Sequence, residues 1–485
     1  MILNKVRMWI SKNLAPLIFL SAYFVTVVVG NILYWLPFGR AQLEKNRYTA
    51  DILEFDTLFS SGYWLLLFIP FVLTPLIVMG VRRIAGGYLE SRGNIFSEFS
   101  KVEYTLITTF SYLFVLFAMF KADAFSLFLS GTDPVSSVEA RFQIRNQLGF
   151  IPLVFLMSIL HYLSIYSLVK YMMAGGRFWI IASVANALLM SVFLSLLNMK
   201  WPILIFYAGL VLAVFVYAKR YAYLKTVIGG VLLIAMYFMV SAFVFRLMPP
   251  APAFVPDPVP SPGISQDSQQ SRQSQPNVDR SDSFNSDLLQ PTPTPVEAKS
   301  VPGDNVVHKV LMVGQAAAQN APMLLFNVVN RMAIIYPYYY QVFTKEGQVC
   351  GGILAQAKIG PACRPSTFIY SRIFNDSFNG RGTAPASVHI SGYALGGWPV
   401  AIFALVCASV VLGLFASLPL TAGPTIGALA VTGAIVGYHF SQVPGEGPIF
   451  YDHGVFWVLA ALVIFKGIRL LVTKLGYHRK PATRL

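Results

Sequence analysis

The sequence has little charge and few cysteines. Only 12% of its 485 residues are charged, whereas globular domains carry about 25%. Hydrophobic residues make up 56% of the chain, and the mean hydropathy is +0.61. This composition excludes a single water-soluble domain and predicts a multi-pass membrane protein. The net charge of +15 lies largely in short clusters between apolar runs, which is typical of cytoplasmic loops rather than of nucleic-acid binding.

Three cysteines leave room for one disulfide at most. Cys407 lies inside an apolar run and is expected to be a small packing residue. Cys350 and Cys363 are 13 residues apart in a long polar segment. They predict a disulfide if that segment faces an oxidising compartment, with two free thiols as the alternative. Their spacing and the lack of a nearby histidine argue against zinc.

Several motifs are missing from the chain. It contains neither GxxxxGK[ST] nor HExxH, and its expected outer loops contain no DxD-like pair. Repeats of 20 to 50 residues, which would indicate a solenoid, are not evident either. We therefore expect no metal and no cofactor.

Apolar runs long enough to cross a bilayer predict the fold class. We expect an all-α polytopic membrane protein with about ten transmembrane helices and a large, partly helical extracytoplasmic loop. With ten spans, most basic clusters fall on one side and both termini are cytoplasmic. The exception is the first connection, where Arg40, Lys45 and Arg47 are accompanied outside by four acidic residues. The expected spans are 15–36, 61–81, 103–120, 149–170, 178–197, 201–218, 226–246, 398–416, 421–440 and 454–471.

The segment between the seventh and eighth expected spans has two unlike parts. Residues 249–303 hold twelve prolines and many Ser, Gln and Asp residues, a composition typical of disorder. Residues 310–396 carry six basic and two acidic side chains and are expected to fold. We expect Pro322–Tyr340 to form a helix at the membrane interface or packed on the bundle. The predicted regions are 1–246 (seven spans), 247–308 (disordered tract), 309–396 (folded loop) and 397–485 (three spans and a tail).

Basic side chains in the expected outer loops are the candidate functional residues. Arg141 and Arg145 would share a helix face, and Lys200 would lie at the outer start of a span. Arg331 interrupts an apolar run, where an unpaired charge is costly. Each also has a plain structural explanation, such as marking a membrane boundary. The set is completed by Arg364, Arg372, Arg381 and His389, with His453 beside Asp452 as a weaker candidate.

Two stretches resemble a known family, the Wzy-type oligosaccharide repeat-unit polymerases, which are relatives of the O-antigen ligases. They are NMKWPILIFYAGLVLAVFVYAKR and GTAPASVHISGYALGGWPVAI. The multiple spans and the large loop before the last few spans add to the resemblance. The resemblance implies a metal-independent glycosyltransferase that uses undecaprenyl-diphosphate-linked oligosaccharides at the outer leaflet. Lys200 and Arg331 match the family's basic positions. His389 lies closer to the glycine pair than the ligase histidine does, which favours a polymerase.

The resemblance also implies roles and partners. It transfers to Lys200 and Arg331, and the charges of the expected outer loops supply the rest of the site. We expect Arg331, Arg372 and His389 to be catalytic, and Arg141, Arg145, Lys200 and Arg381 to bind the substrate diphosphate. The partners would be the lipid-linked glycan donor and acceptor, membrane lipid, and a chain-length regulator and flippase, without nucleic acid. The expected location is the bacterial inner membrane with a periplasmic loop. The alternatives are an O-antigen ligase, a transporter or flippase for an anionic lipid or solute, and a purely partner-docking role for the outer segment.

Overall fold

The computed structural model describes residues 2–44, 52–91, 96–126, 134–197, 200–244, 333–347, 364–374, 382–442 and 454–477. These residues form helices, and no extended strand occurs among them. The chain divides into two compact units. The first comprises Met1–Leu247 and Pro322–Leu485, and the second, Met248–Ala321, lies outside the described residues.

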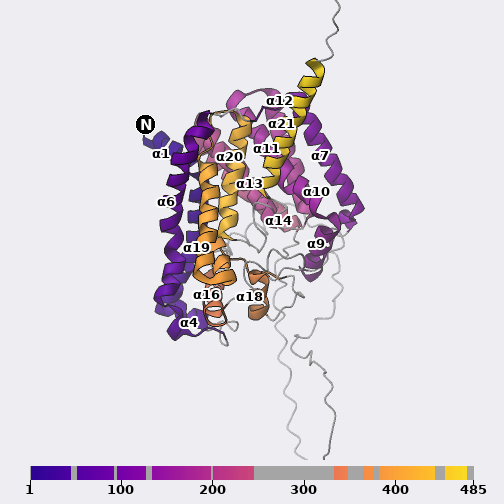
Figure 1. Ribbon diagram of the computed structural model, residues 1–485. Helices are drawn as coiled ribbons and strands as arrows, with labels where there is room; N and C mark the ends of the chain where they lie inside the picture. The colour runs from indigo at the N-terminus through magenta and orange to yellow at the C-terminus, as the bar shows by residue number, and fades with distance from the viewer. Residues whose placement is uncertain are drawn as a thin grey trace, which may run out of the picture. The chain divides into compact units, whose positions relative to one another are not determined.

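The helices of the first unit are arranged as a bundle (Figure 1). Two of the long helices contain a π-helical turn, η1 (Phe24–Val28) and η2 (Phe155–Leu160). The α-helices are α1 (Ile2–Lys12), α2 (Leu14–Tyr23), α3 (Val29–Trp35), α4 (Pro37–Glu44), α5 (Phe55–Leu58), α6 (Ser61–Ser91), α7 (Lys101–Lys121), α9 (Pro134–Leu148), α10 (Phe150–Val154), α11 (His161–Ala174), α12 (Arg177–Leu196), α13 (Lys200–Tyr217), α14 (Ala222–Val244), α16 (Ile335–Lys345), α18 (Pro365–Phe374), α19 (Val388–Ala416), α20 (Pro424–Ser441) and α21 (Val455–Tyr477).

Seven helical stretches of the described chain are long and apolar enough to cross a membrane. The described part of the chain is thus all-helical, with several helices suited to a membrane, as its composition predicts. Every one of the ten expected ranges overlaps a helix. Three of them fall outside the seven: the apolar parts of α13 and α14 are shorter, and α20 is an 18-residue helix rich in glycine and alanine. A total of ten spans therefore stays a prediction.

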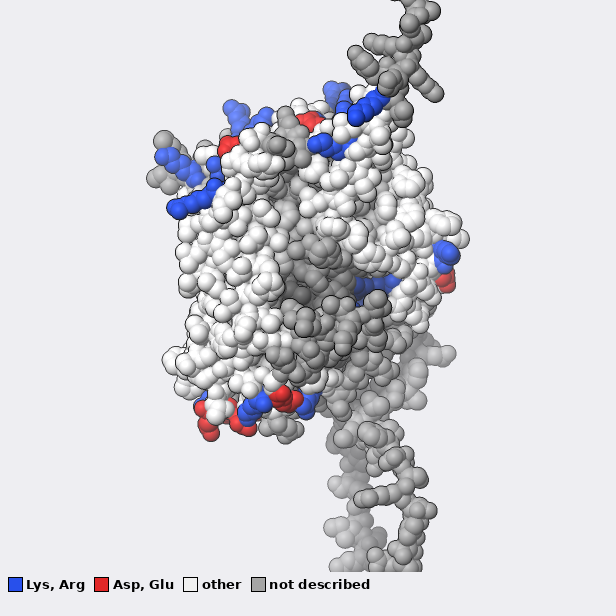
Figure 2. Space-filling model, viewed as in Figure 1, with Lys and Arg blue, Asp and Glu red and all other residues white. Residues whose placement is uncertain are grey.

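Most charged side chains in this view lie at the two ends of the bundle, and only a few lie in the band between them (Figure 2). We call one of these ends the basic end, because basic residues that the sequence predicts to share a side lie there, among them Arg7, Arg82, Lys170 and Lys219. There Arg7 Nη1 donates to the Ala218 carbonyl at 2.9 Å, and Lys170 forms an ion pair with Glu98. Lys219 Nζ lies 3.4 Å from the Met173 carbonyl, so the ends of α11 and α13 meet there as well.

Close helix packing depends on small side chains. Helix α19 runs along α6, and Ser409 Oγ donates to Thr74 Oγ1 at 3.0 Å across this contact. A Cβ at Gly413 would lie only 2.8 Å from Val81 Cβ. Helix α20 packs in the same way on α2, where a Cβ at Gly437 would overlap the Ala15 carbonyl oxygen. Glycine lets these backbones approach, as is usual between membrane helices.

Helix α19 begins ten residues before the expected span and contains a break. It starts at Val388 rather than at residue 398. Gly396 and Gly397 leave helical geometry, and Gly397 has φ +64°, a left-handed value that favours glycine. The residues HISGYAL, expected in the folded loop, are therefore a short helical segment continuous with the eighth expected span.

Candidate functional site

The end of the bundle opposite the basic end carries a helical cap, which we define as residues 333–347 and 364–374. It contains α16 and α18, which lie beside the beginning of α19 (Figure 1). Helix α16 also contacts α5 in the first connection of the chain. The cap is therefore built on the same end that the sequence predicts to be extracytoplasmic.

A run of tyrosines fixes the cap to the bundle. Tyr336 and Tyr339 are buried, and burial raises the pKa of both phenols. The Tyr336 hydroxyl donates to the Tyr63 carbonyl at 2.6 Å, and the Tyr339 hydroxyl donates to the Ala384 carbonyl at 3.0 Å. Each ring thus buries a large apolar area while its polar tip is satisfied. Of the two placements expected for the YPYYY run, the structure shows packing on the bundle.

Asn31 ties the beginning of the cap to α3. Its side chain is 0% exposed, and Nδ2 donates to the Ala333 carbonyl at 3.1 Å and to the Val27 carbonyl at 2.7 Å. The Tyr63 hydroxyl donates to Asn31 Oδ1, so both polar ends of the amide are satisfied. Beside it, a Cβ at Gly30 would overlap the Ala333 side chain. The cap therefore enters the bundle through a close, fully hydrogen-bonded contact.

Replacing Asn31 with alanine is expected to loosen the cap. The substitution leaves the Ala333 carbonyl and the Tyr63 hydroxyl without their partner in a buried place, which costs about 2 kcal/mol. We expect a lower thermal unfolding midpoint and faster proteolysis of the 333–347 segment in detergent. Tyr207→Phe is the control, because it removes a hydroxyl that bonds Ser191 at 2.9 Å elsewhere in the bundle. Equal proteolysis of the two variants would contradict the role given to Asn31.

His389 belongs to a chain of buried polar groups. Its Nδ1 lies 3.0 Å from Ser387 Oγ, which in turn donates to the Phe440 carbonyl at 3.3 Å. Its Nε2 lies 3.1 Å from the Leu66 carbonyl and 3.3 Å from the Tyr23 hydroxyl. The side chain is 0% exposed. This geometry favours the structural alternative for His389, in which both ring nitrogens hold α19 against neighbouring helices. Its catalytic assignment stays a prediction.

The rim of the cap carries ion pairs. Arg372 Nη2 lies 2.7 and 2.8 Å from the two carboxylate oxygens of Glu346, which joins α18 to the end of α16. Its guanidinium also stacks 5.6 Å from the Phe368 ring centre. The two charged side chains are 50% and 42% exposed. Arg372 is thus accessible to an anion, but only in competition with Glu346.

The first connection supplies the other charges of this rim. Arg40 Nε donates to Glu44 at 2.8 Å, and its Nη2 lies 3.4 Å from Asp56. The Glu44 hydrogen bond raises the pKa of the guanidinium. Lys345 of α16 pairs with Glu54 of the same connection. Three of the four acidic residues that accompany Arg40 in the sequence are therefore ion-pair partners of Arg40 or of the cap, and Asp51 lies outside the described residues.

The remaining predicted site residues are distributed as follows. Arg141 and Arg145 both lie on α9, four residues apart as expected, and the Arg141 guanidinium is 4.9 Å from the Phe142 ring centre. Helix α9 packs on α7 and α10, whereas the cap packs on α19. Lys200 is the first residue of α13, and nothing of its side chain is described. Arg331, Arg381, Cys350 and Cys363 lie outside the described residues.

Sequence reasoning missed Asn31, Tyr23 and Tyr63. A polar amide within the first apolar run was the available signal, because a buried amide in a membrane helix needs partners.

No group of three or more His, Cys, Asp or Glu side chains in the described part of the chain could hold a metal ion. Comparisons of the chain with protein-family models, with curated proteins and with solved structures give no match.

Proposed function

We propose that the chain is a polysaccharide polymerase, which joins undecaprenyl-diphosphate-linked oligosaccharide repeat units at the periplasmic face of the bacterial inner membrane. The observation that carries this proposal is the cap docked on the end opposite the basic end, with Arg372 accessible at its rim. If basic clusters face the cytoplasm, this end faces the periplasm. A lipid-linked diphosphate lies at that headgroup level.

The reaction needs charge stabilisation more than it needs a cofactor. A sugar hydroxyl of the acceptor attacks the anomeric carbon of the donor, and the bond from that carbon to the diphosphate oxygen breaks. Undecaprenyl diphosphate leaves with the bond electrons, and the hydroxyl proton passes to a base. Guanidinium groups suit this leaving group because they bond phosphate oxygens in pairs. In this proposal Arg331 and Arg372 contact the diphosphate, assisted by Arg141, Arg145, Lys200 and Arg381.

The test is a reconstitution. Purified protein in proteoliposomes is given lipid-linked repeat units without ATP, and the products are separated by size. A ladder of multiples of the repeat unit supports the polymerase. Transfer of finished polymer to a second acceptor, without growth of the ladder, identifies an O-antigen ligase instead. No covalent change in the glycan rejects both activities.

The Arg372–Glu346 ion pair allows a sharper prediction. If Arg372 contacts the donor, Arg372→Ala lowers polymer synthesis much more than Glu346→Ala, since only the first removes the anion ligand. If the pair only joins α18 to α16, the two substitutions have equal effects. Both variants should remain folded, because an exposed pair contributes at most about 1 kcal/mol. The measurement is the initial rate of elongation for each variant, with the unfolding midpoint recorded beside it.

A transporter is the second candidate, and the break in α19 favours it. Transporters often place substrates at the ends of broken helices near the membrane midplane. The break at Gly396 and Gly397, however, comes only eight residues after Val388 in a 29-residue helix. The break therefore lies in the first third of the helix, on the side of the cap, which suits an enzyme site at the surface. Movement of labelled lipid-linked repeats across the proteoliposome membrane, with no change in their size, would favour transport.

A further inference from the structure

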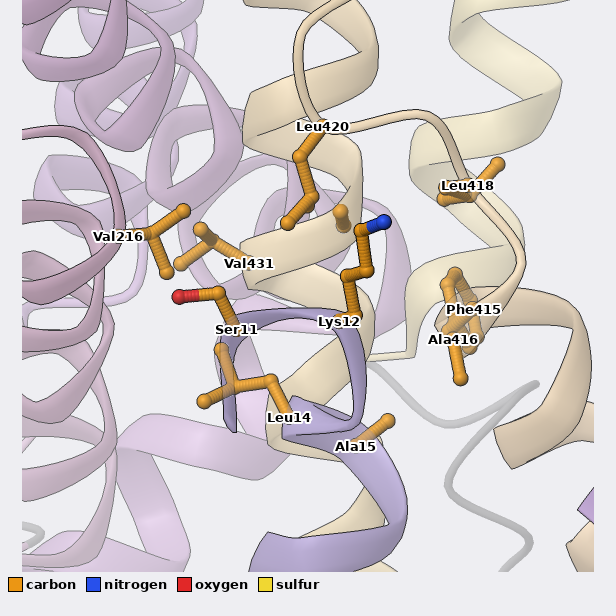
Figure 3. A pocket seen from close by; sticks show the side chains of 11 residues that line it. Ser11, Lys12, Leu14, Ala15, Val216, Phe415, Ala416, Leu418, Leu420 and Val431 are labelled. Atoms are coloured by element: carbon orange, nitrogen blue, oxygen red, sulfur yellow. The ribbon is translucent and has the colours of Figure 1, made fainter. Parts of the chain in front are cut away.

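A second potential site lies at the basic end, away from the cap. A shallow pocket lies between the α1–α2 junction, the end of α13 and the connection from α19 to α20. Most of its empty volume of about 290 Å³ is the open mouth, and its interior has room for about one water-sized group. Nine of its eleven lining residues are apolar, and the two polar ones are Ser11 and Lys12. Figure 3 shows the Ser11 hydroxyl directed toward Val216 and Val431, with the Lys12 side chain beside Leu420.

Ser11 is the first sign of a ligand. Its side chain is only 7% exposed, yet its hydroxyl has no hydrogen-bond partner in the described part of the protein. A buried hydroxyl without a partner is destabilising, so such groups usually bond to something. The hydroxyl lines the pocket and can donate to an acceptor placed there.

One cationic side chain lines the pocket, and two more bond to residues close to its lining. Lys12 is exposed, and no carboxylate of the described residues pairs with it. Arg82 Nη1 donates to Asn13 Oδ1 at 2.7 Å, next in sequence to Lys12. Arg7 Nη1 donates to the carbonyl of Ala218, two residues after Val216 of the lining. Each guanidinium has five donors, so both keep N–H groups for an anion.

The first helix indicates where that anion comes from. Helix α1 carries Lys5, Arg7 and Lys12, and it exposes Val6, Met8 and Trp9 by 45%, 58% and 59%. Such a helix suits the boundary between lipid headgroups and acyl chains. The exposed apolar side chains of α1 can lie against an acyl chain, which a free, hydrated anion lacks.

We infer that the mouth of this pocket binds the phosphate of an anionic phospholipid, whose oxygens accept hydrogen bonds from Ser11 and Lys12 while its acyl chains lie along the exposed apolar side chains of α1. Arg7 and Arg82 add positive charge near the pocket. The site is at the opposite end from the proposed glycosyl transfer and does not depend on it. It would link the packing of α1, α13 and α20 to the lipid composition of the leaflet at the basic end.

Native mass spectrometry of the purified full chain tests the inference. The probes are phosphatidylglycerol, phosphatidylcholine with the same acyl chains, and inorganic phosphate. We expect phosphatidylglycerol to bind in preference, and Lys12→Gln and Ser11→Ala each to weaken its binding about tenfold, as loss of a hydrogen bond to a charged group does. Lys219→Gln is the matched control: it removes a cation of the same end that bonds Met173 outside the pocket.

The variants also separate binding from folding. Without lipid, Ser11→Ala should unfold at the same or a higher temperature, because it removes a buried hydroxyl that lacks a partner. A folded Lys12→Gln protein that binds phosphatidylglycerol as well as the unaltered chain overturns the inference. Equal binding of phosphatidylcholine overturns it too. Displacement of phosphatidylglycerol by an equal concentration of inorganic phosphate would show that the site takes a free anion and not a lipid.

Discussion

Replacing Arg331 with alanine is expected to abolish long polymer while single repeat units still appear on the acceptor. Arg331 lies two residues before Ala333, where the described cap begins, in a run whose next acidic residue is Glu346. A guanidinium aimed at the leaving diphosphate strengthens its interaction as charge develops in the transition state. Losing one such donor costs about 100-fold to 1,000-fold in rate. The measurement is elongation of purified lipid-linked repeats by the reconstituted protein, with products separated by size.

The matched control for Arg331 is another arginine without a role at the cap. Arg83 is exposed on α6 at the basic end, so Arg83→Ala should leave elongation unchanged. Arg331→Lys should restore a small part of the rate, since an ammonium keeps the charge but cannot form paired bonds to phosphate. If a stably expressed Arg331→Ala protein makes polymer of normal length at a normal rate, Arg331 has no catalytic role.

The membrane helices could be anticipated from hydropathy because the bilayer sets a length of about 20 apolar residues for each one. The residue at which α19 begins could not be anticipated in this way. Its glycine pair followed by a proline is typical of a loop ahead of a span, so the expected boundary was residue 398. The structure keeps helices on both sides of Gly396 and Gly397, since Gly397 adopts a left-handed backbone and the helix resumes beyond it. Local composition cannot distinguish a broken helix from a loop.

In the cap, the sequence predicts the types of residue that gather but not which of them form contacts. The tyrosine run was recognisable as a helix bound for an apolar surface, and the acidic neighbours of Arg40 were recognisable as its counter-charges. The bond from Asn31 to Ala333 spans 302 residues, and no local pattern encodes a contact of that separation. The pairing of Arg372 with Glu346 joins two short helices whose packing depends on the whole bundle. Sequence thus predicts which residue types gather at this end, whereas their partners come from tertiary structure.

Substituting alanine for Gly437 is expected to cause the largest loss of stability among the packing variants. The added Cβ would overlap the Ala15 carbonyl oxygen and lie 3.1 Å from the Phe19 amide nitrogen. Both are backbone atoms of α2, so no side-chain rotation relieves the overlap, and α20 must move away from α2. Overpacking of this kind costs about 3 kcal/mol. The expected result is a lower unfolding midpoint and less monodisperse protein after detergent extraction.

Gly467→Ala is the matched control, because it adds the same methyl group to another helix. A Cβ there would meet no atom of the described protein within 4 Å, and alanine is favoured over glycine in a helix by about 1 kcal/mol. This variant should unfold at the same or a higher temperature. Opposite shifts for the two substitutions would establish that α2 and α20 touch through their backbones. If Gly437→Ala is as stable as Gly467→Ala, α2 and α20 are farther apart than the structure places them. The pocket at Ser11 and Lys12, which residues of the same two helices help to line, would then have a different shape.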